Sequence, residues 1–164
     1  MPRLQNKTAL ITGGARGIGA AISRAFRDEG ADVILTDINA EAGQALADEI
    51  GATFARLDVA SEADWNTVAE RFTVLDVLVN NAGITGFEGP FDGAPPAHDP
   101  ENAALADWRN VHAVNTDGTF LGCRIPGLDN GPVVNVYPAA LHESEQRSSD
   151  FGEVICFTVS GLDK

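Results

Sequence analysis

Short apolar runs alternate with amphipathic segments along the first half of the chain. The runs at 8–12, 32–36, 53–57 and 74–79 are rich in aliphatic residues and almost free of polar alternation, which is typical of strands covered on both faces. The segments between them place apolar residues at helical spacing, for example from Ile18 to Glu29. This order predicts an α/β fold, a doubly wound parallel sheet in three αβα layers with right-handed crossovers.

Capping residues mark the ends of the predicted helices. Gly30 is suited to end the first helix, and Gly51 to end a second helix that begins at Asn39 and runs to about Ile50. Ser61 opens a third helix, because the segment Ser-Glu-Ala-Asp has capping-box spacing with Asp in the last position.

The amino-acid composition of the sequence changes after the fourth strand. Residues 84–104 are rich in Gly, Pro and Asp and predict a long loop, followed by a helix from Leu105 to about Gly122 and a fifth strand over 132–136. In the tail, 139–147 suits a short helix and 154–159 is strongly β-prone. The spacing permits a parallel crossover, so we expect a sixth strand beside the fifth.

Acidic residues outnumber basic ones by 24 to 11, which gives a formal net charge of −13. So negative a surface repels a phosphate backbone and argues against nucleic acid as a partner. An anionic ligand must then be bound locally, by backbone N–H groups and a helix terminus. The chain starts without an apolar signal segment and has no run long enough to span a membrane, so we expect a soluble cytoplasmic protein.

The cysteine and histidine spacing predicts no metal site. Cys123 and Cys156 form no CxxC pair, and the three histidines are scattered. We expect both cysteines to be small buried apolar residues.

A glycine-rich turn joins the first strand to the first helix. The segment Thr12–Gly19 offers glycines for a tight turn, for close approach of a pyrophosphate and for helix–strand packing, in the strand–turn–helix context of a Rossmann-like dinucleotide site. The alternative is a purely structural turn. The residues predicted to bind the cofactor here are Gly13, Ala15, Arg16, Gly17, Ile18 and Gly19.

Asp37 ends the second strand, about 20 residues after the glycines. With its neighbour Ile38 it is predicted to lie beside the adenosine ribose, where a carboxylate accepts hydrogen bonds from the hydroxyls and repels a 2′-phosphate. This favours NAD over NADP, although Arg16 offers a cation to a phosphate. A solvated acid at the strand end is the alternative interpretation of Asp37.

Four ordered motifs over residues 3–136 resemble the classical short-chain dehydrogenase/reductase family: the glycine turn, Asp58-Val59, the NNAG segment and a helix segment with Asn115 and Gly118. The fifth strand, Val133–Val136, is also similar. The resemblance implies that Asp58 and Val59 contact adenine, that Asn81, Ala82 and Gly83 lie beside the cofactor, and that Asn80 mainly ties strands together. It implies a catalytic Asn115 that holds a water in a proton relay, with a helix-surface asparagine as the alternative.

The catalytic motif of that family is not found in this sequence. The family uses a Tyr hydroxyl whose pKa is lowered by a Lys four residues later, and a Ser after the fifth strand. Here Tyr137 is followed four residues later by Leu141, and Pro138 stands at the Ser position. Among the four catalytic groups only Asn115 has a counterpart.

We therefore expect an NAD(P)-binding Rossmann domain over 1–136 and a divergent tail over 137–164, whether through truncation, divergence or a shifted frame. The resemblance implies an NAD(P)-dependent oxidoreductase that acts on a carbonyl or a secondary alcohol. The alternatives are a catalytically silent NAD-binding remnant and a non-functional product that associates with a full-length homologue. A homo-oligomer is also compatible with the sequence, and the substrate cannot be deduced from it.

Overall fold

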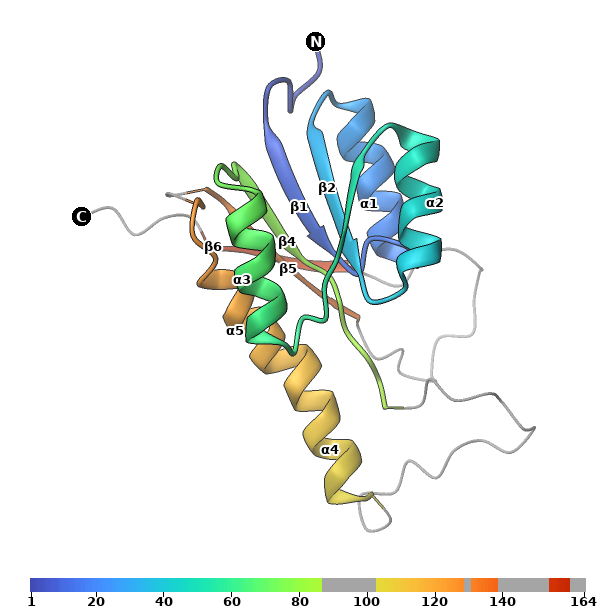
Figure 1. Ribbon diagram of the computed structural model, residues 1–164, viewed down its shortest axis with the longest axis vertical. Helices are drawn as coiled ribbons and strands as arrows, with labels where there is room; N and C mark the ends of the chain where they lie inside the picture. Colours follow the sequence, from blue (N-terminus) through green and yellow to red (C-terminus); the bar gives the residue numbers. More distant parts are fainter. Residues whose placement is uncertain (87–102, 129–130, 139–153, 160–164) are drawn as a thin grey trace.

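The computed structural model describes residues 1–86, 103–128, 131–138 and 154–159, with the backbone alone for 137–138 and 154–159. Strands and helices alternate along the first half of the chain, as predicted (Figure 1). The elements are β1 (Thr8–Thr12), α1 (Gly17–Asp28), β2 (Asp32–Asp37), α2 (Ala40–Ile50), β3 (Thr53–Arg56), α3 (Glu62–Arg71), β4 (Val77–Asn80), α4 (Leu105–His112), η2 (Ala113–Asp117), α5 (Gly118–Cys123), β5 (Val133–Pro138) and β6 (Val154–Val159).

The strands form one sheet in the order β3-β2-β1-β4-β5-β6. The first five strands are parallel, which confirms the predicted doubly wound sheet. The sixth strand lies beside the fifth as expected, but it is antiparallel, so the predicted parallel crossover is wrong. Pro138, the last residue of β5, pairs with Val154, the first residue of β6. β6 therefore starts at the end of the sheet where β5 stops, whereas a parallel strand would have to start at the opposite end.

Two apolar clusters cover the two faces of the sheet, and successive strand residues alternate between them. Ala9 and Ile11 pack with α1 and α2, whereas Leu10 packs with α3. In Figure 1, α1 and α2 lie on one side of the sheet and α3 and α5 on the other. The three-layer αβα arrangement is thus confirmed. Because both faces are buried, the strands need no polar residues facing solvent.

Local capping explains where the helices begin and end. The Asn39 side chain accepts the N–H of Ala42, and Ser61 Oγ accepts the N–H of Asp64, as the sequence predicted. Gly30 and Gly51 follow α1 and α2 with positive φ angles of 87° and 66°, which a residue with a Cβ rarely adopts.

The predicted helix from Leu105 to Gly122 is present, but it contains a π-helical turn. The segments α4, η2 and α5 follow one another without a break, and η2 contains Asn115. Leu105, Trp108 and Phe120 are more than half exposed along it. Figure 1 shows α4 extending beyond the layers of the sheet. The predicted loop at 84–104 lies mostly outside the described residues, as does the predicted helix at 139–147.

Two further expectations need correction. The fourth strand begins at Val77 and not at Val74, because the Asp76 carboxylate accepts the Thr8 N–H and Val74 is exposed. Cys123, the last residue of α5, is exposed and not buried, although its Sγ lies 3.8 Å from Asn80 Nδ2. The side chain of Cys156, in β6, is outside the described part of the structure.

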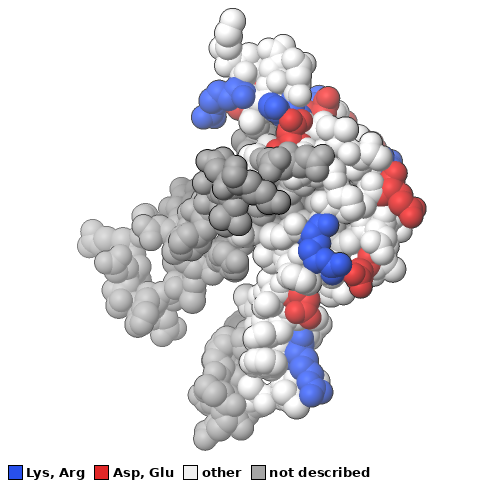
Figure 2. All heavy atoms as spheres, turned by 90° about the vertical axis from the view of Figure 1, so that its left-hand side faces the viewer, with Lys and Arg blue, Asp and Glu red and all other residues white. Residues whose placement is uncertain are grey.

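Opposite charges are interspersed on the surface. Figure 2 shows basic side chains spread over one face, with acidic side chains close to several of them. Ion pairs such as Arg3–Glu29 and Lys7–Asp76, each at 2.8 Å, tie the N-terminal segment to the sheet layers. No helix among the described residues is long and apolar enough to cross a membrane.

Candidate functional site

The carboxyl ends of β1, β2, β3 and β4 meet at one edge of the sheet. Thr12 at the end of β1 pairs with Thr36, and Asp37 at the end of β2 pairs with Arg56. The ends of these strands, the turns that follow them and the first residues of α1 carry every residue predicted to bind a cofactor. Ligands of open α/β sheets bind at this edge, so the predicted residues are brought together in the expected place.

Two glycines of the first turn are required by packing. A Cβ on Gly13 would lie 2.8 Å from the Cα of Ala82, and Gly13 also has a φ of +62°. A Cβ on Gly19 would lie 2.8 Å from the carbonyl carbon of Gly13 and closer still to its oxygen. Only glycine lets the first turn of α1 and the loop after β4 approach so closely.

Gly17 has a different environment. Its φ is +52°, yet a Cβ there would meet no atom within 4 Å. Gly17 is exposed together with Arg16 and Ile18, and no side chain caps α1. The first bond into the helix is donated by Ala20 to the Arg16 carbonyl, so the preceding N–H groups have no acceptor inside the helix. The helix N-terminus is therefore open to an anion.

The Asp37 carboxylate is held beside this turn. Its Oδ2 accepts the N–H of Ala15 at 3.1 Å, and its Oδ1 accepts the N–H of Asn39 at 2.9 Å. Asp37 is only 9% exposed, whereas the adjacent Ile38 is 62% exposed. Two main-chain donors thus fix the carboxylate next to an exposed apolar side chain.

The glycine turn is locked to the segment Asn81-Ala82-Gly83. Thr12 Oγ1 accepts the N–H groups of Asn81 and Ala82, each at 3.0 Å. The Asn81 amide in turn donates to the carbonyls of Thr12 and Gly13, at 2.9 and 3.1 Å. The role of Thr12 in joining the two segments was not predicted from the sequence. The signal that could have indicated it is a hydroxyl residue at the end of the strand, directly before the glycines.

Asn80 joins two strands, as the family resemblance implied. Its Nδ2 donates to Asn135 Oδ1 at 2.9 Å, which links β4 to β5. A Cβ on Gly122 of α5 would overlap the Asn80 side-chain oxygen. Asn80 is buried under α5, so its place is within the framework of the site.

Asn115 lies beside the loop after β4. Its Oδ1 accepts the N–H of Ile84 at 2.9 Å, and its Nδ2 donates to the Ile84 carbonyl at 2.8 Å. The Thr119 hydroxyl donates to the main-chain carbonyl of Asn115, also at 2.8 Å. A Cβ on Gly83 would lie 3.5 Å from Asn115 Oδ1. The side-chain amide therefore holds this loop against η2 through one accepted and one donated hydrogen bond.

Asp58 and Val59 begin the turn between β3 and α3. Asp58 is half-buried, and its Oδ1 accepts the N–H of Ala60 at 3.0 Å. Val59 is buried in the second apolar cluster, and its carbonyl accepts the indole N–H of Trp65 at 2.9 Å. Only Asp58 of this pair therefore has a side chain near the surface of the site.

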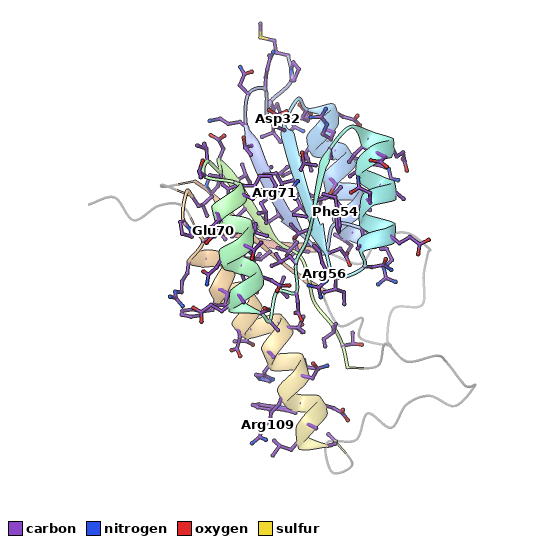
Figure 3. The ribbon with its side chains drawn as sticks, in the orientation of Figure 1. Asp32, Phe54, Arg56, Glu70, Arg71 and Arg109 are labelled. Carbon is purple, nitrogen blue, oxygen red and sulfur yellow. The ribbon has the colours of Figure 1, made fainter. Side chains whose placement is uncertain are left out.

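Asp64 supports this turn and was noted in the sequence only as a capping residue. Its Oδ2 accepts the N–H of Asp58 at 3.0 Å and the Arg56 guanidinium at 2.7 Å. Hydrogen bonding to the Asp58 N–H is the largest influence that lowers the pKa of Asp64, with further contributions from Ser61 and Arg56. Figure 3 shows Arg56 at the end of β3, where the chain turns toward α3.

A family model described as short chain dehydrogenase matches residues 7–145. The chain belongs to the short-chain dehydrogenase family. The match extends nine residues past 136, where the motif resemblance stopped (145 against 136).

Several curated relatives are dehydrogenases. The chain is 44% identical over 128 residues to the 3-beta-hydroxysteroid dehydrogenase of Comamonas testosteroni, an alignment that covers 74% of this chain and 46% of that protein. It is 37% identical to the NADP-dependent (R)-specific alcohol dehydrogenase of Lentilactobacillus kefiri, over 75% of this chain and 48% of that one. The chain spans about half the length of these relatives.

A solved structure shares the fold. The 3-ketoacyl-(acyl-carrier-protein) reductase of Brucella melitensis, complexed with NADH, superimposes with a TM-score of 0.65 at 32% sequence identity. The superposition covers 74% of this chain and 49% of that one. The Rossmann-like architecture predicted from the sequence is thus confirmed by a relative with the same fold.

Proposed function

We propose that this chain binds a nicotinamide dinucleotide, NAD in preference to NADP, as the cofactor-binding part of an NAD(P)-dependent oxidoreductase. The observation that carries the proposal is the open position at Gly17, at the exposed N-terminus of α1 and beside the anchored Asp37 carboxylate. An empty Cβ position, free helix N–H groups and a fixed carboxylate match a pyrophosphate followed by a ribose diol. A nicotinamide dinucleotide has both groups, and a solved relative was crystallised with NADH.

Each group of site residues contacts a different part of the cofactor. Arg16, Gly17 and Ile18 face the pyrophosphate, and Asp37 with Ile38 faces the adenosine ribose. Asp58 takes the adenine amino group, while Ala82 and Gly83 line the way to the nicotinamide. This assignment follows the family pattern, and it is supported by the exposure of Arg16, Gly17, Ile18, Ile38 and Gly83 at one edge of the sheet.

The preference for NAD rests on charge. Both Asp37 oxygens accept main-chain N–H groups, which leaves the carboxylate little freedom to rotate. A 2′-phosphate would meet this charge directly. The exposed Arg16 opposes the preference, and one relative is named NADP-dependent. We give Asp37 more weight because it lies nearer the 2′ position.

When bound, the nicotinamide supplies the hydride acceptor or donor for a carbonyl or secondary alcohol substrate. Among this chain's residues, Asn115 holds the Ile84 backbone and so fixes the loop beside the nicotinamide end of the site. The sequence has no Tyr followed four residues later by Lys. We therefore expect the 164-residue chain by itself to bind the cofactor without measurable turnover.

A catalytically silent NAD-binding protein is the second candidate. It is favoured by Pro138 and Leu141 at the positions where the family has Ser and Lys, and by the two bonds through which the Asn115 side chain holds the Ile84 backbone. Steady NADH production from a panel of secondary alcohols, abolished by Asn115→Ala, would contradict this candidate.

Calorimetry with NAD and NADP tests the binding proposal. Wild-type protein should bind NAD more tightly, and Asp37→Ala should lose about ten-fold in NAD affinity and most of the preference over NADP. Asp48→Ala is the matched control, since Asp48 is an exposed acid on α2 whose side chain, among the residues that the structure describes, is bonded only by Gln44. A folded wild-type sample without NAD affinity would refute the proposal.

A further inference from the structure

The turn between β3 and α3 is organised around the carboxylate of Asp64. Its Oδ2 accepts the Asp58 N–H and the Arg56 guanidinium, and its Oδ1 accepts the Ser61 hydroxyl at 3.1 Å. The Asp64 N–H returns a bond to Ser61 Oγ at 3.2 Å. One side chain from the first turn of α3 thus holds both ends of the 58–61 turn.

Asp58 is left with one defined acceptor. Its main-chain N–H is taken by Asp64, its carbonyl by the N–H of Ser61 and its Oδ1 by the N–H of Ala60. Among the residues that the structure describes, no donor contacts Oδ2 of Asp58. The backbone bonds leave the Asp58 side chain little freedom, so this oxygen faces a ligand in a fixed direction.

The ion pair between Arg56 and Asp64 matters for the charge on Asp58. Arg56 precedes Asp58 by two residues and pairs with Asp64 at 2.7 Å, with more than half of its side chain exposed. Without Asp64, this flexible cation would have Asp58 as a neighbouring carboxylate partner. Asp64 therefore keeps Arg56 away from the oxygen that is open to a ligand.

We propose that Asp64 is a positioning residue for adenine recognition, which fixes the Asp58 main chain and withholds Arg56 from the Asp58 carboxylate. This inference rests on the proposed dinucleotide binding. It assigns the selectivity for a 6-amino purine to a residue that itself need not touch the cofactor.

The experiment compares the affinity for NAD with that for nicotinamide hypoxanthine dinucleotide, in which an oxygen replaces the adenine amino group. Wild-type protein should prefer NAD by about ten-fold, the effect of one hydrogen bond to a charged acceptor. Asp58→Ala should bring this ratio close to one. Asp64→Ala should lower the affinity ratio to about two-fold. The double variant Asp58→Ala/Asp64→Ala should have the same ratio as Asp58→Ala alone.

Ser61→Ala is the matched control. Ser61→Ala removes the side-chain cap of α3, and Asp64→Ala also disturbs this cap. Ser61→Ala differs because it keeps the bond from the Asp58 N–H to Asp64. Both variants should therefore unfold at lower temperature, and only Asp64→Ala should change the affinity ratio. If Asp64→Ala does not fold, Asp64→Asn replaces it, with an intermediate ratio expected because an amide oxygen retains one acceptor without the charge.

Wild-type selectivity that persists in the folded Asp64 variant would overturn the inference while leaving dinucleotide binding intact. The same holds for a Ser61→Ala variant that loses the selectivity equally, since the effect would then belong to the helix cap. Absence of NAD binding by folded wild-type protein would instead overturn the proposed function itself.

Discussion

Gly19 should be the glycine whose replacement the fold tolerates least in the first turn. A Cβ there overlaps the Gly13 carbonyl and also reaches within 2.5 Å of the Asn81 amide nitrogen. Both neighbours are backbone or are bonded to backbone, so neither can move aside like the end of a flexible side chain. Overpacking of this kind costs about 1–3 kcal/mol. The gain from alanine in a helix, about 1 kcal/mol, offsets only part of it.

Gly17 provides the matched contrast. Its φ of +52° strains an L-residue by about 1–2 kcal/mol, but the added Cβ meets no atom. Alanine also reduces the conformational entropy of the unfolded chain relative to glycine, which stabilises the folded protein by about 0.4–1 kcal/mol. We therefore expect Gly17→Ala to lose up to about 1.6 kcal/mol of stability. The same methyl group would stand where the pyrophosphate approaches, so dinucleotide affinity should fall by about ten-fold or more.

Urea unfolding, followed by tryptophan fluorescence, measures the first effect, and NADH fluorescence titration measures the second. Gly19→Ala should have the lower urea midpoint, whereas Gly17→Ala should keep a midpoint closer to the wild-type value and lose binding. The steric reasoning would be refuted by a Gly19→Ala protein that unfolds at the wild-type midpoint. Normal NADH affinity in Gly17→Ala would refute the assignment of the anion site.

Two further outcomes concern stability. Asn115→Ala removes both hydrogen bonds to Ile84 and should lower the free energy of unfolding in urea by about 2 kcal/mol. The control Asn110→Ala, at an exposed position of α4, should change this free energy little. Equal effects of the two variants would contradict the role given to the η2 turn. The hydrogen bond from Lys7, followed by that from the Thr8 N–H, lowers the pKa of Asp76 in the folded protein. The ionised Asp76 therefore stabilises the fold fully above its unfolded pKa of about 4, and this stabilisation is lost as the pH falls through its folded pKa. Asp76→Asn should therefore be less stable than wild type at pH 7, by a margin that shrinks at pH 3, and a pH-independent margin would contradict this assignment.

Much of the fold could be predicted because its signals are local. A positive φ at Gly30 or Gly51, a cap at Asn39 or Ser61 and an apolar run buried on both faces depend on a few neighbouring residues. The glycine turn and Asp37 were found in the same way, since the strand–turn–helix unit itself places them at one edge of the sheet.

Other features depend on residues that lie far apart in the chain. The direction of β6 could not be predicted, because the length of its connection allows either orientation and only pairing with β5 selects one. The exposure of Cys123 depends on how α5 packs against the sheet, which periodicity leaves open.

The alternation of strands and helices, the glycine turn and the acid at the end of β2 can be read from the sequence, because each arises from local backbone preference and hydrophobic pattern. Which polar groups hold that site in place depends on contacts that form in the folded protein. The bonds from the Ile84 N–H to Asn115 and from the Asn81 N–H to Thr12 span 31 and 69 residues, and they form only once the strand order has brought those segments together. Hydrogen bonds act over a few ångströms of space, and sequence separation does not reveal that distance.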